Sequence, residues 1–337
     1  MILFSDYVHS LICALQREAR FSAAESYGTV LKRFCAFRGS SRVRFSGLTP
    51  SCIKGFELFL YSGGCQRNTV SLYLRLFRSI CRQAASEGYM KYDDRLFSSV
   101  FLGHDPCSKR AVSADAIRHL SELDLSGKKG LCLARDLFLL SFYLRGIPFI
   151  DLAHLRKSDV RDGVVHYRRS KTGQPLSIRL EAWALEIIDR YGGDVPGSPY
   201  LLPIIKRPGE PDEHKQYQSA LRLYNKRLNQ LSRMVGLEKN LTSYVARHSW
   251  ATLAYHEGIP VSEISAGLSH TSEQVTYAYL ESFSADALAS VNLQVVALVN
   301  AHARKCWESE ANRMRREKQK TFRFLKGTGT MMLQRNS

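Results

Sequence analysis

Side chains suited to chemistry on a phosphate are concentrated in the stretch from Leu241 to Phe283, inside an otherwise apolar helical pattern. Transfer of a phosphoryl group needs a nucleophile, cationic donors around the phosphate oxygens and a proton for the leaving oxygen. Arginine suits the second task, because its planar guanidinium matches a phosphate and stays charged. The stretch offers all three kinds of group: Tyr244, Arg247 and His248 in one segment, His270 in a Ser/Thr-rich turn, and Tyr277 and Tyr279 in the next segment.

Two further cations lie upstream. Arg145 follows residues 131–144, which are apolar on nearly all faces and predict a buried helix. Lys171 lies in the turn SKTGQ between GVVHYRR and PLSIRL, two segments that predict a β-hairpin. Taken singly, each cation has an ordinary explanation: Arg145 could cap a helix end, Arg247 could pair with an acid, and Lys171 could be an exposed turn residue.

The order of these groups changes that judgement. The chain runs from YLRG (Arg145) through RRSKTG (Lys171) and YVARHSWAT (Arg247) to LSHTSEQVTYAYL (His270 and Tyr279). This order and spacing resemble the tyrosine recombinases, also called phage integrases, and the style of the motifs resembles recombinases of bacterial mobile elements and invertible loci. The resemblance covers residues 113–300, and the N-terminal helices are similar to the family's core-binding domain.

The resemblance implies site-specific cutting and rejoining of DNA without metal or nucleotide cofactor. Tyr279 would attack the scissile phosphate to give a 3′-phosphotyrosine, and Lys171 would protonate the leaving 5′-oxygen. Arg145, Arg247 and His270 would hold the non-bridging oxygens. The family also implies double-stranded DNA as the partner and a homotetramer on two DNA sites, with the apolar segment from Ala285 to Val299 docking on a neighbouring protomer or packing on its own domain.

Two tyrosines compete for the role of nucleophile. Tyr277 and Tyr279 are two residues apart, so on a helix they would point about 200° apart and only one could face the arginines. The nine-residue step from His270 selects Tyr279, as in the family, and leaves Tyr277 for packing or for a contact with the DNA backbone.

Three positions depart from the family pattern, and one further histidine lies beside Arg247. Tyr244 stands where the family usually has His, and its hydroxyl can still donate to a phosphate oxygen; His248 is expected to be structural. Asp151 comes about three residues later than the acid common after the first Arg, so it has the same supporting role or is only a helix N-terminal acid. Ser269 replaces a common Gly, which is tolerated unless the backbone there needs a positive φ.

Periodicity predicts a mainly α fold with a small β-hairpin or sheet, in two domains. The pattern predicts four helices in residues 1–90, a linker in 91–112 and a basic tail in 301–337. The resemblance implies that residues 1–90 are a SAM-like core-binding domain and that 113–300 are the catalytic domain. Thr49-Pro50 predicts the start of the third helix, and Ser113 predicts an N-cap at the start of the catalytic domain.

Composition supports this interpretation. The 337 residues carry 48 Lys and Arg against 31 Asp and Glu, a net charge of +17 that favours a polyanionic partner. The eight scattered cysteines form no metal or disulfide pattern, and no signal peptide or membrane span is evident, which predicts a soluble cytoplasmic protein. The rival interpretations are a catalytically impaired DNA-binding or regulatory protein that keeps this fold, and a basic scaffold without a DNA role.

Overall fold

The structure, a computed structural model, describes residues 2–105, 110–192, 197–277 and 279–280. The chain divides into two units, Met1–Ala278 and Tyr279–Ser337, and the second contributes only Tyr279 and Leu280 to the described residues. The segment from Ala285 to Val299 and the basic tail therefore lie outside the described part of the chain.

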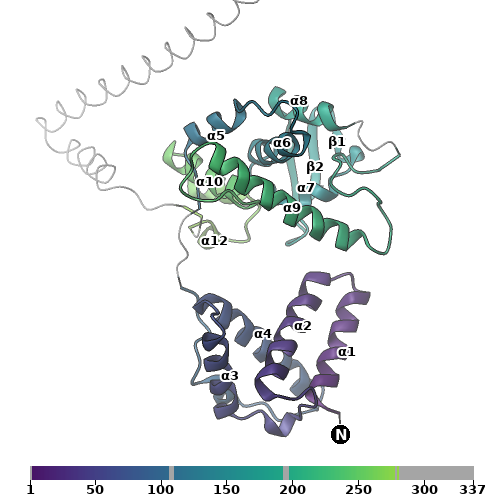
Figure 1. Ribbon diagram of the computed structural model, residues 1–337, viewed down its shortest axis with the longest axis vertical. Helices are drawn as coiled ribbons and strands as arrows, with labels where there is room; N and C mark the ends of the chain where they lie inside the picture. Colours follow the sequence, from purple (N-terminus) through teal and green to yellow (C-terminus); the bar gives the residue numbers. More distant parts are fainter. Residues whose placement is uncertain (1, 106–109, 193–196, 278, 281–337) are drawn as a thin grey trace, which may run out of the picture. The chain divides into compact units, whose positions relative to one another are not determined.

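The N-terminal residues form four helices, as the apolar periodicity predicted (Figure 1). They are α1 (Phe4–Arg17), α2 (Phe21–Arg38), α3 (Pro50–Ser62) and α4 (Arg67–Ser86), with short 3-10 turns η1 (Phe45–Gly47) and η2 (Asp94–Phe97). The third helix begins where expected: the Thr49 side chain accepts a hydrogen bond from the Cys52 backbone N–H, and Pro50 occupies the first helical turn.

Aromatic side chains fill the core of these four helices. Phe4, Phe34, Phe56 and Phe77 are fully buried, and their rings meet at centroid distances of 4.6 to 5.9 Å. Burying large rings at such distances is a main source of stability for a small helical core. Phe97 of η2 also packs into this core, so the packing extends into the segment that was predicted to be a linker.

The remaining described residues form a mainly helical layer around a small sheet (Figure 1). The helices are α5 (Ala114–Ser121), α6 (Lys129–Tyr143), α7 (Phe149–His154), α8 (Ala182–Tyr191), α9 (Glu213–Met234), α10 (Val245–His256), α11 (Val261–Gly267) and α12 (Glu273–Tyr277), with the 3-10 turn η3 (Lys157–Asp159). Ser113 caps α5 as predicted, since its hydroxyl accepts from the Ala116 backbone N–H.

The sheet has three antiparallel strands in the order β1 (Val160–Arg161), β2 (Val164–Arg168) and β3 (Pro175–Arg179). The β2–β3 hairpin is the predicted one, with Val165 opposite Ile178 and both side chains buried. The two-residue strand β1 was not predicted.

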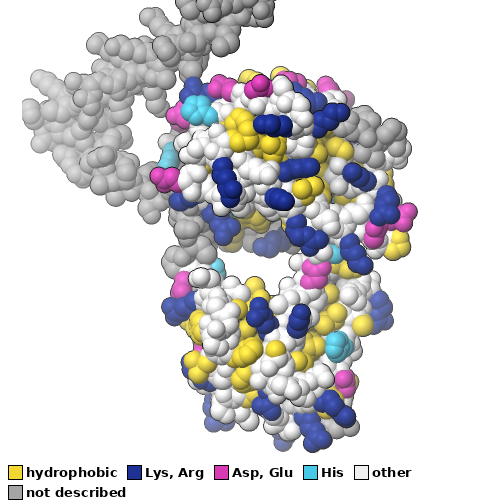
Figure 2. Space-filling model, in the orientation of Figure 1, with side chains coloured by type: hydrophobic (Ala, Val, Ile, Leu, Met, Phe, Trp, Pro, Cys, Tyr) yellow, Lys and Arg dark blue, Asp and Glu magenta, His cyan; other side chains and the backbone are white. Residues whose placement is uncertain are grey.

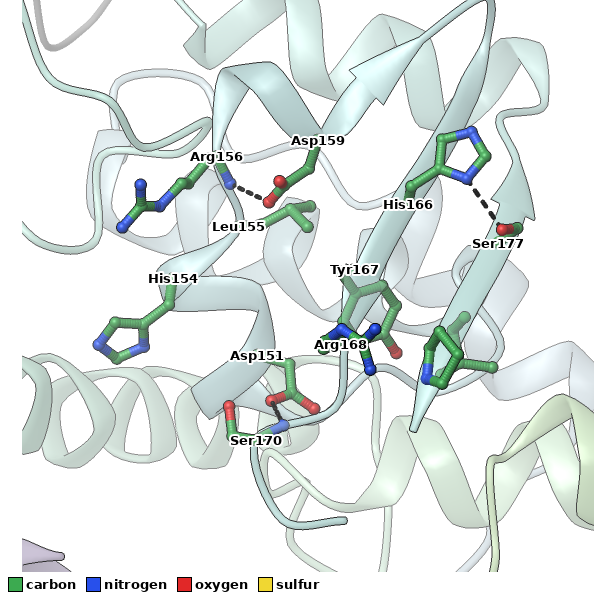
Figure 3. A pocket seen from close by; sticks show the side chains of 12 residues that line it. Asp151, His154, Leu155, Arg156, Asp159, His166, Tyr167, Arg168, Ser170 and Ser177 are labelled. Atoms are coloured by element: carbon green, nitrogen blue, oxygen red, sulfur yellow. Dashed lines mark hydrogen bonds between the residues drawn. The ribbon is translucent and has the colours of Figure 1, made fainter. Parts of the chain in front are cut away.

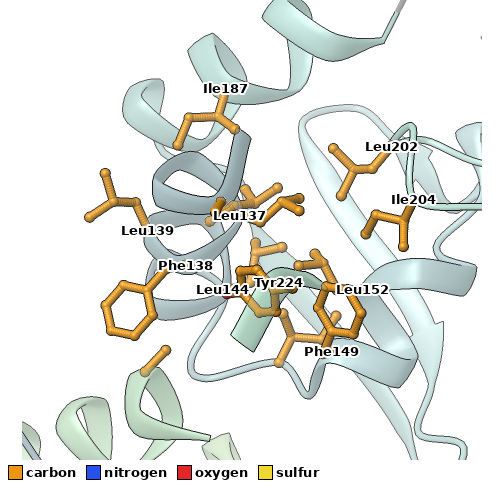
Figure 4. Close-up of a cluster of buried hydrophobic side chains, with 14 of the residues drawn as sticks. Leu137, Phe138, Leu139, Leu144, Phe149, Leu152, Ile187, Leu202, Ile204 and Tyr224 are labelled. Carbon is orange, nitrogen blue, oxygen red and sulfur yellow. The ribbon is translucent and has the colours of Figure 1, made fainter. Parts of the chain in front are cut away.

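Helix α6 runs through the middle of this second core, which explains its apolar residues on nearly all faces. Figure 4 shows Leu137, Phe138 and Leu144 of this segment packed with residues of other elements, among them Phe149 and Tyr224. The rings of Phe149 and Tyr224 are stacked with centroids 4.5 Å apart. This packing fixes the C-terminal end of α6, from which Arg145 projects.

Candidate active site

The turn that ends α6 carries Arg145, and its Gly146 carbonyl accepts a hydrogen bond from the buried Arg247. Arg145 and Gly146 both have left-handed backbone conformations, with φ values of +56° and +70°. The Gly146 N–H donates to the Ser141 carbonyl at 2.8 Å, which closes the end of the helix. The side chain of Arg145, half-buried, reaches Gly267 of α11.

Arg247 lies in α10 and is only 2% exposed. Its guanidinium donates to the Gly146 carbonyl at 2.9 Å and, through Nη2, to the Leu268 carbonyl. These two backbone carbonyls orient the guanidinium fork of Arg247.

His270 lies beside Arg247. The Arg247 Nη2 group is 3.1 Å from His270 Nε2, and His270 Nδ1 is 2.8 Å from the Thr276 hydroxyl oxygen. A guanidinium can only donate, so Nε2 accepts and the imidazole carries its proton on Nδ1. Burial, followed by the charges of Arg247, Arg169 and Lys171, lowers the pKa of His270 to about 4. His270 is therefore neutral at pH 7.

This depressed pKa predicts a pH dependence of stability. Between pH 6.5 and about 4 the unfolded chain binds a proton at His270 that the folded chain does not, so the free energy of unfolding falls as the pH falls through this window. A shift of this size corresponds to at most about 3 kcal/mol, and partial exposure reduces it.

Urea unfolding of wild type and His270→Gln at pH 7 and pH 4.5 checks this, with His256→Gln controlling for the loss of an exposed imidazole in the same region. The stability of His270→Gln relative to wild type should improve as the pH falls. An equal difference at both pH values would contradict the depressed pKa.

Lys171 is exposed in the turn between β2 and β3, and the base of this turn is held by an acid from α7. Asp151 is 4% exposed, and its Oδ1 accepts from the Ser170 backbone N–H at 2.9 Å. Asp151 thus lies in the first turn of its helix and also supports the lysine hairpin. Figure 3 shows this contact at the edge of a cavity of about 430 Å³ between α7, η3 and the hairpin.

Tyr167 of β2 lies close to one acid and three arginines of the site. Burial raises the pKa of Tyr167 above its usual range, and Asp151 raises it further, while Arg247, Arg169 and Arg145 act in the opposite direction. Together with the influence of Lys171 on His270, this places Arg145, Lys171, Arg247 and His270 in one electrostatic neighbourhood.

The two tyrosines differ from expectation. Helix α12 ends at Tyr277, so Tyr277 and Tyr279 do not share a helix and the argument from a 200° separation was wrong. Tyr277 is 49% exposed, which excludes a core role for it. Tyr279 lies in the turn beyond α12 and belongs to the second unit of the chain, so the geometry of the site is built from the first unit alone.

Tyr244 is the N-cap residue of α10, one turn before Arg247, and is 39% exposed. Its ring lies 6.2 Å from that of His248, which is partly buried in the same helix. Tyr244 is thus an exposed residue at the start of this helix, and its role as a phosphate contact stays a prediction.

The backbone at Ser269 has the positive φ that would explain why the family commonly has glycine at this position. Its φ is +54°, in the left-handed region that favours glycine. The side chain compensates by donating to the Gln174 amide oxygen at 2.6 Å. The serine is thus accommodated at the cost of a strained conformation, and it gains a contact with the hairpin that glycine could not make.

Arg169 was missed at the sequence level. It is 4% exposed, and its Nη1 donates to the carbonyls of Leu268 and Ser269 at 2.9 and 3.1 Å. A signal was present: in a strand with alternating faces, 165, 167 and 169 point the same way, and Val165 is fully buried. Arg168, its neighbour, faces solvent.

Buried and half-buried arginines lie around a neutral histidine, next to a lysine hairpin, in a mainly helical fold, and groups of this kind can bind a phosphate. The described ranges contain no helix long and apolar enough to cross a membrane. Comparison with known proteins agrees with this class. Residues 3–97 match the phage integrase SAM-like domain, and residues 131–285 match the phage integrase family.

Curated relatives and solved structures extend the match over most of the chain. The tyrosine recombinase XerD of Listeria innocua is 22% identical over 286 residues, covering 82% of this chain and 93% of the relative. A lambda integrase dimer bound to a core site has the same fold, with a TM-score of 0.56, 17% identity and coverage of 79% of this chain and 93% of the other.

The Tn1549 transposon integrase, in complex with transposon right end DNA, has a TM-score of 0.60 at 12% identity, covering 88% of this chain and all of that one. The chain therefore belongs to the tyrosine recombinase, or phage integrase, family, as its motifs indicated. It is a site-specific recombinase by family.

Proposed function

We propose that this protein cuts and rejoins double-stranded DNA at specific sites through a 3′-phosphotyrosine intermediate. One observation carries the proposal: Arg247, His270 and the Arg145–Gly146 turn are joined by hydrogen bonds, with Lys171 close enough to affect the titration of His270. Such a preorganised set of donors suits a phosphate whose charge increases in the transition state.

In this mechanism Arg145 and Arg247 stabilise the non-bridging oxygens. Arg247 is well suited because its orientation is already fixed by the Gly146 and Leu268 carbonyls, so little reorganisation is needed when the phosphate arrives. Tyr244 adds a hydroxyl donor from the start of α10.

His270 has a role that depends on DNA binding. In the free protein its Nε2 accepts from Arg247 and cannot donate to a phosphate. A phosphate nearby favours the protonated imidazole and raises its pKa from about 4. Once protonated, Nε2 donates to a non-bridging oxygen, which is the role assigned to His270 by the resemblance.

The chemistry then follows with atoms in balance. The Tyr279 hydroxyl gives its proton to solvent water and attacks phosphorus, forming the phosphotyrosine bond. The bond from phosphorus to the 5′-oxygen breaks, and Lys171 gives that oxygen a proton. A 5′-hydroxyl of a second strand later attacks the phosphotyrosine and releases Tyr279, so the phosphodiester bond energy is conserved.

The DNA partner is supported by charge and by the relatives. Figure 2 shows more Lys and Arg than Asp and Glu side chains on the face that carries α6 and α9, in keeping with the net charge of +17. Among the structural neighbours, lambda integrase is bound as a tetramer to a Holliday junction. We infer a homotetramer on two DNA sites for this chain, with residues 1–90 and 113–300 as its two DNA-contacting domains, joined by 91–112.

A trapping experiment tests the proposal. The cognate site is first selected from random duplexes by binding to the protein, and a nick beside the scissile phosphate then prevents religation. With chelator present and no nucleotide, we expect a covalent adduct that mass spectrometry maps to Tyr279, together with a free 5′-hydroxyl that a kinase labels directly. Tight binding of the site without an adduct would refute the proposal and favour the catalytically impaired regulator.

A further inference from the structure

The hairpin that carries Lys171 is joined to the turn that carries His270 by side chains to which the family resemblance gives no role. Arg169, at the base of the hairpin turn, donates from Nη1 to the Leu268 and Ser269 carbonyls at 2.9 and 3.1 Å. From the other side of the same turn, Gln174 accepts from the Ser269 hydroxyl at 2.6 Å. Residues 169 and 174 are themselves paired, because the Arg169 N–H donates to the Gln174 carbonyl at 2.9 Å.

The histidine turn is well anchored without these contacts. Leu268 also accepts from Arg247, and the His270 N–H donates to the Ser265 carbonyl at 3.0 Å. The His270 ring is held from both nitrogens, by Arg247 and by Thr276. Loss of Arg169 should therefore leave His270 and Arg247 close to where they are.

The lysine turn has fewer anchors. Lys171 and its neighbours Ser170 and Gly173 are exposed, and the turn is held to the rest of the domain by the Asp151 contact to Ser170 and by the links of Arg169 and Gln174. The contacts of Arg169 and Gln174 with residues 268–269 thus restrain the hairpin more than they restrain the turn that carries His270.

A purely structural role does not account for the choice of arginine. Arg169 is 4% exposed, its guanidinium donates to carbonyls, and no carboxylate within the described ranges forms an ion pair with it. Nε has no hydrogen-bond partner among the described residues. Burying an uncompensated charge is costly, and an apolar residue would pack a hairpin onto a turn more cheaply.

We propose that Arg169 is a positioning residue for the proton donor: by locking the hairpin base to residues 268–269, it keeps the Lys171 ammonium on the same side as His270, where the leaving oxygen lies. The Ser269–Gln174 contact is the second half of this lock. The inference rests on the proposed function, because it assumes that Lys171 protonates the leaving 5′-oxygen.

A substrate with sulfur in place of the leaving 5′-oxygen separates proton donation from every other role. A thiol, with a pKa of about 8.5, leaves as the thiolate without a proton donor, whereas an alkoxide does not. Single-turnover cleavage of the oxygen and sulfur substrates is compared for wild type, Lys171→Met, Arg169→Met and Arg169→Lys. The affinity of each variant for the cognate DNA site is measured in parallel.

We expect Arg169→Met to cleave the oxygen substrate about 100-fold more slowly than wild type, because displacing a catalytic group by about 1 Å can have that effect. With the sulfur substrate its rate should lie within a few-fold of wild type, and its affinity for DNA should be unchanged. Arg169→Lys, which keeps the positive charge and an ammonium that can donate to the carbonyls, should recover part of the oxygen rate. Should Arg169→Met fail to fold, Gln174→Ala removes the second half of the lock and should show a weaker version of the same pattern.

The outcomes distinguish the positioning role of Arg169 from the proton-donor role of Lys171. If sulfur rescues neither Lys171→Met nor Arg169→Met, the proton-donor role of Lys171 is wrong. If sulfur rescues Lys171→Met but not Arg169→Met, or if Arg169→Met cleaves the oxygen substrate normally, the mechanism stands and the positioning role of Arg169 is overturned.

Discussion

Replacing Tyr279 by phenylalanine is expected to abolish the covalent protein–DNA adduct, whereas Tyr277→Phe should retain it. Phenylalanine lacks the oxygen that bonds to phosphorus, so no other group of the site can compensate. Loss of a nucleophile lowers the rate on the order of 10⁴-fold or more. The measurement is adduct formation on the nicked cognate duplex, followed by gel electrophoresis.

Tyr277 is a matched control because it is the same residue type two positions away. It lies at the end of α12 with about half of its surface exposed, so its replacement removes little packing. DNA binding should be preserved in both variants. An adduct that survives in Tyr279→Phe and disappears in Tyr277→Phe would exchange the two assignments, and one that survives in both would place the nucleophile elsewhere.

Local signals in the sequence were sufficient to locate the four N-terminal helices. Apolar periodicity located the four N-terminal helices, and Thr49 and Ser113 cap helices where their positions predicted. Strand β1 has only two residues, too few for an alternating pattern, and it forms because Val160 pairs with Val165 of β2. Pairing of that kind depends on tertiary structure and not on the pattern of the strand itself.

The arginines of the site show where sequence reasoning ends. Arg168 and Arg169 are adjacent and identical in type, yet one faces solvent and the other is buried against the histidine turn. Strand alternation distinguishes them, but it cannot say that the partner is a pair of carbonyls a hundred residues later. In the same way, α12 ends at Tyr277 and not beyond Tyr279, and helix ends are difficult to locate by periodicity.

The turn after α6 is the subject of the second large prediction, since at Gly146 the segment that carries Arg145 touches the helix that carries Arg247. A Cβ atom at Gly146 would lie 2.5 Å from the Arg247 Cα and 2.8 Å from its Cβ, and φ at this residue is +70°. Backbone atoms of a buried helix cannot move aside in the way the end of a flexible side chain can. Gly146→Ala should therefore separate α10 from the end of α6.

Two effects should follow from Gly146→Ala. The free energy of unfolding should fall by about 3 kcal/mol or more, from left-handed strain and overpacking together. Cleavage should fall by at least about 100-fold, because the Gly146 carbonyl that orients Arg247 moves with the turn. Urea unfolding and single-turnover cleavage of the nicked duplex measure the two effects.

Gly236→Ala separates the contribution of the backbone angle from that of the contact. Gly236 has φ +69°, within a degree of Gly146, but a Cβ there would meet nothing within 4 Å. Its replacement should cost about 1 kcal/mol of strain and leave cleavage unchanged. Equal destabilisation by the two substitutions would mean that strain at the positive φ accounts for the whole effect at Gly146. The close approach of α10 to the Arg145 turn would then not be what holds Arg247 in place.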